Sequence, residues 1–168
     1  MGHNGAVRLR NVHERFLPVP AASAGRLLDG LGGRPDPLWP TEDWPPMRLD
    51  RSLLVGAAGG HGPIRYRVEE YEPGSRVRFG FTGPPGLTGF HEFVVAEAPG
   101  GCVLRHAIEG RTTGAMLLAW PVFYRPLHDA LIEDSLDKAE RTLTGAGVRP
   151  RSRSWWVRLL RRVGRRPR

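Results

Sequence analysis

Short segments of alternating apolar and polar residues, separated by glycine and proline, constrain the fold of this 168-residue chain more than any other feature. Glycine- and proline-rich breaks lie at 56–62, 73–74, 82–86 and 99–101. Alternation with period two between such breaks is typical of antiparallel strands joined by tight turns. We therefore expect strands at 47–57, 64–72, 75–82, 89–98 and 102–110.

The faces of these predicted strands agree with one another. A turn at 73–74 would pair Tyr66 with Phe81 and Val68 with Phe79, so that apolar side chains meet on one face. A turn at 100–101 would set His106 opposite Val95, on the same face as His91. The predicted inner face consists of Ile64, Tyr66, Val68, Glu70, Val77, Phe79, Phe81, His91, Phe93, Val95, Cys102, Leu104, His106 and Ile108.

The flanking segments complete the order of elements. Residues 7–16 read as a first strand, and 21–31 as a short helix that ends at two glycines. The loop 34–46 holds five prolines together with Trp39 and Trp44, whose indole rings we expect to be buried.

From 115 to 144 the apolar residues recur at helical spacing, with an expected end at Gly145. Pro121 and Pro126 should kink or restart this helix, because proline lacks a backbone N–H donor. This order predicts an α+β domain in which a curved antiparallel sheet of about six strands grips a long C-terminal helix. The length favours one domain with a sizeable core.

Three parts of the chain carry a resemblance to a known family: VHERFLPVPA at 12–21, the strand series, and RPLHDALIEDSLDKAE at 125–140. Residues 7–145 resemble the SRPBCC superfamily, the START-like helix-grip proteins that include polyketide cyclases and lipid-transfer domains. The resemblance implies a cavity between sheet and helix for an apolar or amphipathic small molecule. It implies no catalytic set. The expected organisation is a flexible N-terminus (1–6), a START-like domain (7–145) and a basic Arg/Trp tail (146–168).

Several polar groups fall on the otherwise apolar inner face. Burying a polar group without a partner costs about 1–3 kcal/mol, so Tyr66, His91 and His106 should bond to one another, to water or to a ligand. Hydrogen-bonded core residues and ligand contacts both remain open interpretations. Glu70 lies near a strand end, where we expect solvent to reach it.

The last helix presents a stripe that includes His128. Asp129 and Glu133 on this helix should be solvated or paired with arginine. The predicted ligand-binding residues are Tyr66, Val68, Phe79, Phe81, His91, Phe93, His106, Ile108, Trp120, Tyr124 and His128.

Catalysis is an alternative to simple binding. His91, His106 and Tyr66 are candidate acid–base groups for cyclising or dehydrating a carbonyl substrate. No motif specifies this chemistry. The histidines lack the spacing of a metal site, and the single Cys102 excludes an internal disulfide and a cysteine cluster. We expect no metal and no cofactor.

The charge of the chain is concentrated in its tail. The formal net charge is +8, yet nine of the 25 basic residues are arginines within 149–168, where no acid occurs. The remainder holds 16 basic and 17 acidic residues and is close to neutral. The high isoelectric point therefore says nothing about the ligand of the domain.

The tail is predicted to form a short basic amphipathic helix capped by Ser154. Tryptophan and leucine beside arginine favour binding to an anionic membrane surface over specific nucleic-acid binding, which we do not expect. A disordered solubilising tail and docking onto the domain remain alternatives. The predicted membrane residues are Trp155, Trp156, Leu159, Leu160, Arg158, Arg161 and Arg162.

No secretory signal and no apolar run of spanning length is visible, so we expect a cytoplasmic protein that can be peripheral to a membrane. The leading hypothesis is a domain that binds a hydrophobic small molecule, lipid-like or polyketide-like. A cyclase- or dehydratase-like enzyme and a membrane-peripheral protein are the alternatives.

Overall fold

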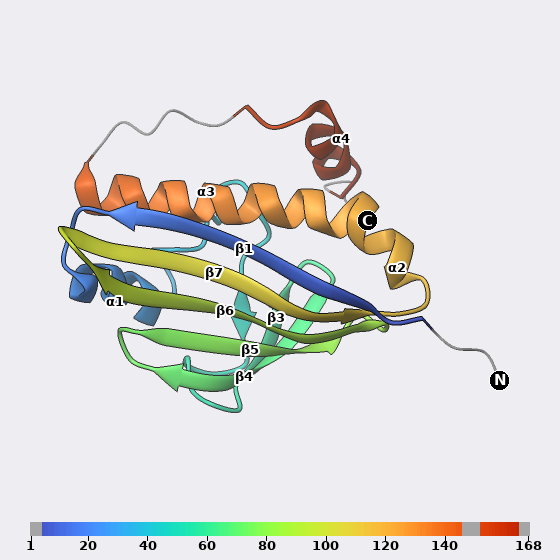
Figure 1. Ribbon diagram of the computed structural model, residues 1–168, viewed down its shortest axis with the longest axis horizontal. Coiled ribbons are helices and arrows are strands. Elements are labelled where there is room, and N and C mark those ends of the chain that lie inside the picture. The colour runs from blue at the N-terminus through green and yellow to red at the C-terminus, as the bar shows by residue number, and fades with distance from the viewer. Residues whose placement is uncertain (1–4, 146–151, 165–168) are drawn as a thin grey trace.

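The computed structural model describes residues 5–145 and 152–164 (Figure 1). The expected segment 1–6 and the start of the tail therefore lie largely outside the described residues. The elements in chain order are β1 (Val7–Leu17), α1 (Ala21–Asp29), β2 (Arg48–Leu49), β3 (Ala58–His61), β4 (Ile64–Glu72), β5 (Arg76–Gly83), β6 (Leu87–Ala98), β7 (Gly101–Thr112), α2 (Met116–Ala119), the π-helical turn η1 (Trp120–Tyr124), α3 (Arg125–Thr144) and α4 (Trp155–Gly164).

One curved antiparallel sheet holds all the strands in the order β1-β7-β6-β5-β4-β3-β2. The long helix α3 lies across one face of this sheet, and α4 sits above α3 (Figure 1). The sheet and α3 share one hydrophobic core. The α+β class and the helix-grip arrangement predicted from sequence are confirmed.

The strand predicted at 47–57 is wrong. Residues 50–57 form a loop, in which the carboxylate of Asp50 accepts the backbone N–H of Ala58 and the backbone N–H of Gly56 donates to the carbonyl of Val68 in β4. Only β2 remains of that prediction, and β3 forms within the stretch 56–62, predicted to be a break, so the sheet has seven strands instead of about six.

The pairing of β4 with β5 is confirmed for Tyr66 with Phe81 and for Val68 with Phe79. The placement of Glu70 on the inner face is wrong. A register shift between Val68 and Glu70 turns the following residues over, as an extra residue in one strand does. The Glu70 carboxylate therefore lies 3.0 Å from the Arg76 guanidinium and 2.7 Å from that of Arg78, on the outer face.

The pairing of β6 with β7 keeps the predicted faces but shifts the partner by two residues. His106 lies opposite Phe93, and Val95 lies opposite Leu104. Because the period of a strand is two, this shift leaves His106 on the inner face with His91.

The two prolines interrupt the last helix as predicted. Between α2 and α3 the backbone N–H of Arg125 bonds to the carbonyl of Trp120, which widens the helix into the π-helical turn η1. Gly145 adopts a left-handed conformation with φ 66° and ends α3, as expected.

The proline-rich loop is ordered by Asp36, whose carboxylate accepts the backbone N–H groups of Gly32, Leu38 and Trp39. Trp39 and Trp44 are buried, as predicted. The loop is fastened to α3, since the Trp44 indole donates to Asp134.

The tail helix α4 begins as predicted, because the hydroxyl of Ser154 accepts the backbone N–H of Val157. It packs on the domain: Val157 is buried, and the Trp156 indole donates to the carbonyl of Val122 at 2.8 Å. Within the described residues, no helix has the length and apolar character needed to cross a membrane.

Candidate functional site

A cavity of about 250 Å³ opens between the inner face of the sheet, α3 and the proline-rich loop. It exceeds the roughly 150 Å³ engineered cavity in which benzene binds, so it has room for a larger small molecule. Its lining residues are Trp39, Asp43, Trp44, Pro45, His61, Gly62, Pro63, Ile64, Phe81, Leu87, His91, His106, Ile108, Trp120, Tyr124, Leu127, His128, Leu131, Ile132, Leu160 and Arg161.

The predicted ligand-binding residues divide into two groups. One group lines the cavity: Phe81, His91, His106, Ile108, Trp120, Tyr124 and His128. The other group is packed in the core beside the cavity: Tyr66, Val68, Phe79 and Phe93. These four share the inner face, but neighbouring side chains cover them, which strand alternation alone does not reveal.

Four histidines from four different elements line the cavity. They come from β3 (His61), β6 (His91), β7 (His106) and α3 (His128). The rings of His91, His106 and His128 form a row, with 5.5 Å between the centroids of the first two and 5.0 Å between those of the last two. Tyr66 lies between His61 and this row, 5.7 Å from the ring of His61 and 4.9 Å from that of His91. The cavity thus has a polar wall of imidazoles within an aromatic and aliphatic lining.

Sequence reasoning missed His61, because it lies at the end of a glycine-rich stretch that reads as a turn. It also missed His13 on β1, whose ring centroid is 6.0 Å from that of His128. Alternation along β1 would have found His13, since it shares a face with the buried Leu9 and Leu17.

His91 and His106 are held as neutral imidazoles. Both are almost fully buried, and this burial lowers the pKa of each well below 6.5, with neighbouring histidines adding to the effect. Burial likewise lowers the pKa of His61 to about 3.

The neutral rings retain unused bonding capacity. Nε2 of His106 lies 3.4 Å from Nδ1 of His91, whereas Nε2 of His91 and Nδ1 of His106 are buried with no hydrogen-bond partner in the described structure. Each of these unpartnered nitrogens costs about 1–3 kcal/mol of stability, and a hydrogen bond from a polar group of a ligand or from a water molecule would remove that cost.

Tyr66 does not line the cavity. Its hydroxyl lies 3.2 Å from Nδ1 of His61, and burial raises its pKa above the ordinary value. It supports the wall of the cavity by positioning His61.

An acidic face of α3 meets β1 beside the cavity. Glu133 accepts from Arg15 and Asp129 pairs with Arg125 at 3.8 Å, as expected. Asp129 also bonds to Asn11 and His13. Burial alone would raise the pKa of Asp129, yet its contacts with His128, His13 and Asn11 outweigh that effect and lower it. The bond to Asp129 in turn raises the pKa of His13, against the opposing effect of burial.

The tail helix α4 closes part of the cavity mouth. Leu160 and Arg161 line it, and the Arg161 guanidinium lies 4.6 Å from the ring centroid of Trp44. Arg153 forms ion pairs with Asp43 at 2.7 Å and with Asp134 at 2.6 Å. Trp155, Arg158, Leu159 and Arg162, also predicted to face a membrane, are exposed on the outer side of α4.

The buried histidines predict a loss of stability in mild acid. Since the pKa values of His61, His91 and His106 in the folded state lie below 6.5, the unfolded chain binds more protons there. Above pH 6.5 these histidines are neutral in both states and do not make stability depend on pH. Below it, the free energy of unfolding falls by up to about 1.4 kcal/mol per pH unit for each histidine. His13, with its raised pKa, opposes them.

We expect His106→Phe to show a shallower fall in the free energy of unfolding than the wild type between about pH 6.5 and 5. Urea denaturation at constant ionic strength measures this slope. Parallel slopes for the two proteins would contradict the neutral state assigned to His106.

No protein-family model matches the chain, and no curated protein matches it, whereas solved structures do. The chain is similar to norcoclaurine synthase from Thalictrum flavum, with TM-score 0.63 and 12% identity over 84% of this chain and 97% of that one. It is also similar to the di-domain aromatase/cyclase StfQ of the steffimycin biosynthetic pathway, with TM-score 0.62 and 13% identity over 84% of this chain and 53% of StfQ. A third is Ara h 8.0201, with TM-score 0.58 and 11% identity over 83% and 100%. The chain therefore has the helix-grip fold of the SRPBCC and Bet v1-like proteins.

Proposed function

We propose that this protein binds an apolar or amphipathic small molecule, lipid-like or polyketide-like, in the cavity between the sheet and α3. The observation that carries the proposal is a mainly apolar cavity whose wall holds partnerless nitrogens on His91 and His106. The apolar part of such a ligand would lie against Phe81, Ile108 and Leu131. A carbonyl or hydroxyl group on the ligand would bond to the histidines.

Filling the cavity should abolish binding. Ile108 is buried and lines the cavity, so Ile108→Trp is expected to reduce the affinity for the fluorescent probe anilinonaphthalene sulfonate at least about tenfold. Val103→Trp, at an outward position of the same strand, is the matched control and should bind like the wild type. Native mass spectrometry of the purified protein tests for a ligand that is retained from the host.

Equal fluorescence titrations for wild type and Ile108→Trp would place the probe outside the cavity. A protein that binds neither the probe nor any retained small molecule would contradict the proposal.

A cyclase- or dehydratase-like activity is the second candidate, and the 3.4 Å approach of His106 to His91 favours it. Two imidazoles at one cavity wall can share the work of an aldol condensation. One neutral ring removes a proton from the carbon beside a carbonyl and becomes an imidazolium. That proton, passed on directly or through the second ring, goes to the oxygen that leaves as water, so both rings end neutral. The earlier candidate Tyr66 takes only a positioning role here, because its hydroxyl is bonded to His61.

A linear diketone with three methylenes between its carbonyls is a suitable model substrate, because it closes to a cyclic enone and water. We expect His106→Phe to lower the rate of enone formation at least about 100-fold, the usual contribution of an acid–base group. Ultraviolet absorbance follows the enone, with Val103→Trp as the control. A wild-type rate no faster than that of buffer would exclude this activity for the model substrate, and an unchanged rate in His106→Phe would exclude the role of His106.

Membrane docking around the cavity mouth is a further candidate, favoured by an exposed aromatic patch. The Trp156 ring lies 5.5 Å from that of Trp155 and 6.3 Å from that of Phe123, so α4 and η1 present one continuous aromatic surface. Arg158 and Arg162 are exposed on the same helix. Aromatic rings beside arginine fit the interface of an anionic bilayer.

We expect the wild type to float with phosphatidylserine-containing vesicles at low salt and much less at high salt. The double variant Trp155→Ala/Leu159→Ala should float at least about fivefold less. Leu54→Ala/Val55→Ala, an exposed apolar pair on the loop after β2, is the matched control. Equal flotation of all three proteins would remove this candidate.

A further inference from the structure

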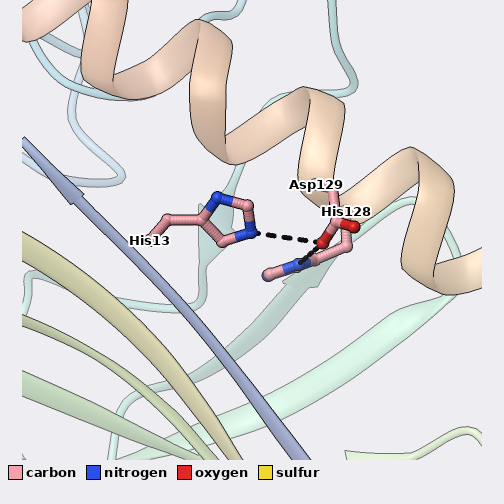
Figure 2. A group of neighbouring side chains, drawn as sticks. All are labelled: His13, His128 and Asp129. Atoms are coloured by element: carbon pink, nitrogen blue, oxygen red, sulfur yellow. Dashed lines mark hydrogen bonds and ion pairs between the residues drawn. The ribbon is translucent and has the colours of Figure 1, made fainter. Parts of the chain in front are cut away.

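Three potential metal ligands meet where β1 faces the start of α3 (Figure 2). His13 projects from β1, while His128 and Asp129 project from α3, and the carboxylate lies between the two rings in Figure 2. Nε2 of His13 lies 3.2 Å from Oδ1 of Asp129, and Nδ1 of His128 lies 3.6 Å from the same oxygen. One ligand atom from each residue falls within 4.8 Å of the others.

We propose that His13, His128 and Asp129 form a zinc site. Ligands about 2.0–2.1 Å from a tetrahedral zinc ion are separated from one another by about 3.3 Å. The two measured separations bracket this value, so an ion could enter with small side-chain movements. Two histidines and a carboxylate are the ligand set of open zinc sites, which keep a fourth position for water or another ligand.

The surrounding residues orient this ligand set. Nδ1 of His13 lies 2.8 Å from Oε1 of Glu133, which leaves Nε2 as the nitrogen directed toward the site. Asn11 donates to Oδ1 of Asp129 at 2.9 Å. A carboxylate behind a histidine ligand and a donor behind a carboxylate ligand are the usual outer partners of a zinc site.

The hydrogen-bond pattern calls for a cation between the ligands. Each ring nitrogen of His13 faces a carboxylate oxygen, that of Glu133 at 2.8 Å and that of Asp129 at 3.2 Å, so a neutral imidazole can donate to only one of the two. Both ring nitrogens of His128 are buried without a hydrogen-bond partner in the described structure. A metal ion satisfies Nε2 of His13 and Nδ1 of His128 together, whereas a proton on His13 satisfies only the first.

Charge on this face of α3 also favours a cation. The carboxylates are those of Asp129, Glu133, Asp137 and Glu140, and they are paired with the guanidiniums of Arg15 and Arg125. Among the described residues, a face so rich in carboxylates suits a positive ion beside Asp129.

The site adjoins the proposed ligand cavity through one residue. His128 lines that cavity, so it is the direct link between a bound metal and a molecule in the cavity. The metal site does not depend on that ligand, because its three residues and their outer partners are present without it.

Zinc titration of the chelator-stripped full chain by calorimetry tests the proposal. We expect one zinc ion per chain, with an affinity at least about 100-fold lower in His128→Gln and in Asp129→Asn. Glu133→Gln keeps all three ligands and should lower the affinity about tenfold, the lower end of the effect of losing an outer partner. Cobalt substituted for zinc should give visible absorption bands of a tetrahedral site in the wild type and not in Asp129→Asn.

Two controls separate this site from adventitious binding. His61→Gln removes a cavity histidine outside the ligand set, and His3→Gln removes the histidine near the amino terminus that lies outside the described residues. Both should bind zinc like the wild type, and the melting temperatures of the metal-free proteins report whether each variant is folded.

Failure of the folded wild type to bind zinc would overturn the proposal, as would wild-type affinity in Asp129→Asn or loss of binding in His3→Gln. Probe binding to the metal-free protein is measured separately, so failure of the metal site and failure of the ligand cavity are distinguishable.

Discussion

The register of β5, β6 and β7 determines which side chains face α3, and the candidate site depends on that register. Phe79 lies opposite His91, and Phe93 lies opposite His106, all on the inner face. Because successive side chains point to opposite faces, a slip of one residue would carry both histidines into solvent and replace them with charged neighbours such as Glu92. The surrounding apolar residues therefore specify the register that buries the histidines.

Burial of these imidazoles is tolerated because they pack as aromatic rings. His91 stacks on Phe79 with 4.9 Å between ring centroids, and His106 meets the ring of Phe93 at 4.6 Å. Desolvation keeps both rings neutral, which removes the cost of a buried charge but leaves one nitrogen of each without a partner. The same packing that stabilises the sheet thus produces a polar wall that faces an apolar cavity.

Arginines of the tail form ion pairs beside the cavity mouth, which the amino-acid composition alone does not reveal. The net charge of +8 belongs to the last twenty residues, and part of that charge is paired with the domain. Arg153 and Arg161 both contact Asp43, which lines the cavity mouth. These ion pairs hold the apolar side of α4 against the opening, while Arg158 and Arg162 remain exposed.

The sequence by itself determined the α+β order, the paired inner faces of β4 and β5, the proline interruption of the last helix and the cap of α4. These features follow from the periodicity of apolar residues and from local backbone chemistry, both of which can be recognised in a single sequence. His91, His106 and His128 were found as candidates for the same reason.

Only the tertiary structure decided which inner-face residues border empty space and which are covered. Tyr66 and Phe79 share a face with Phe81, yet only Phe81 reaches the cavity. The register shift that turns Glu70 to the outer face cannot be recognised from the alternation of residues in β4. The contact between His13 and Asp129 joins residues that are 116 positions apart in the sequence. Such outcomes depend on the curvature of the sheet and on the packing of distant elements, which no local pattern of residues encodes.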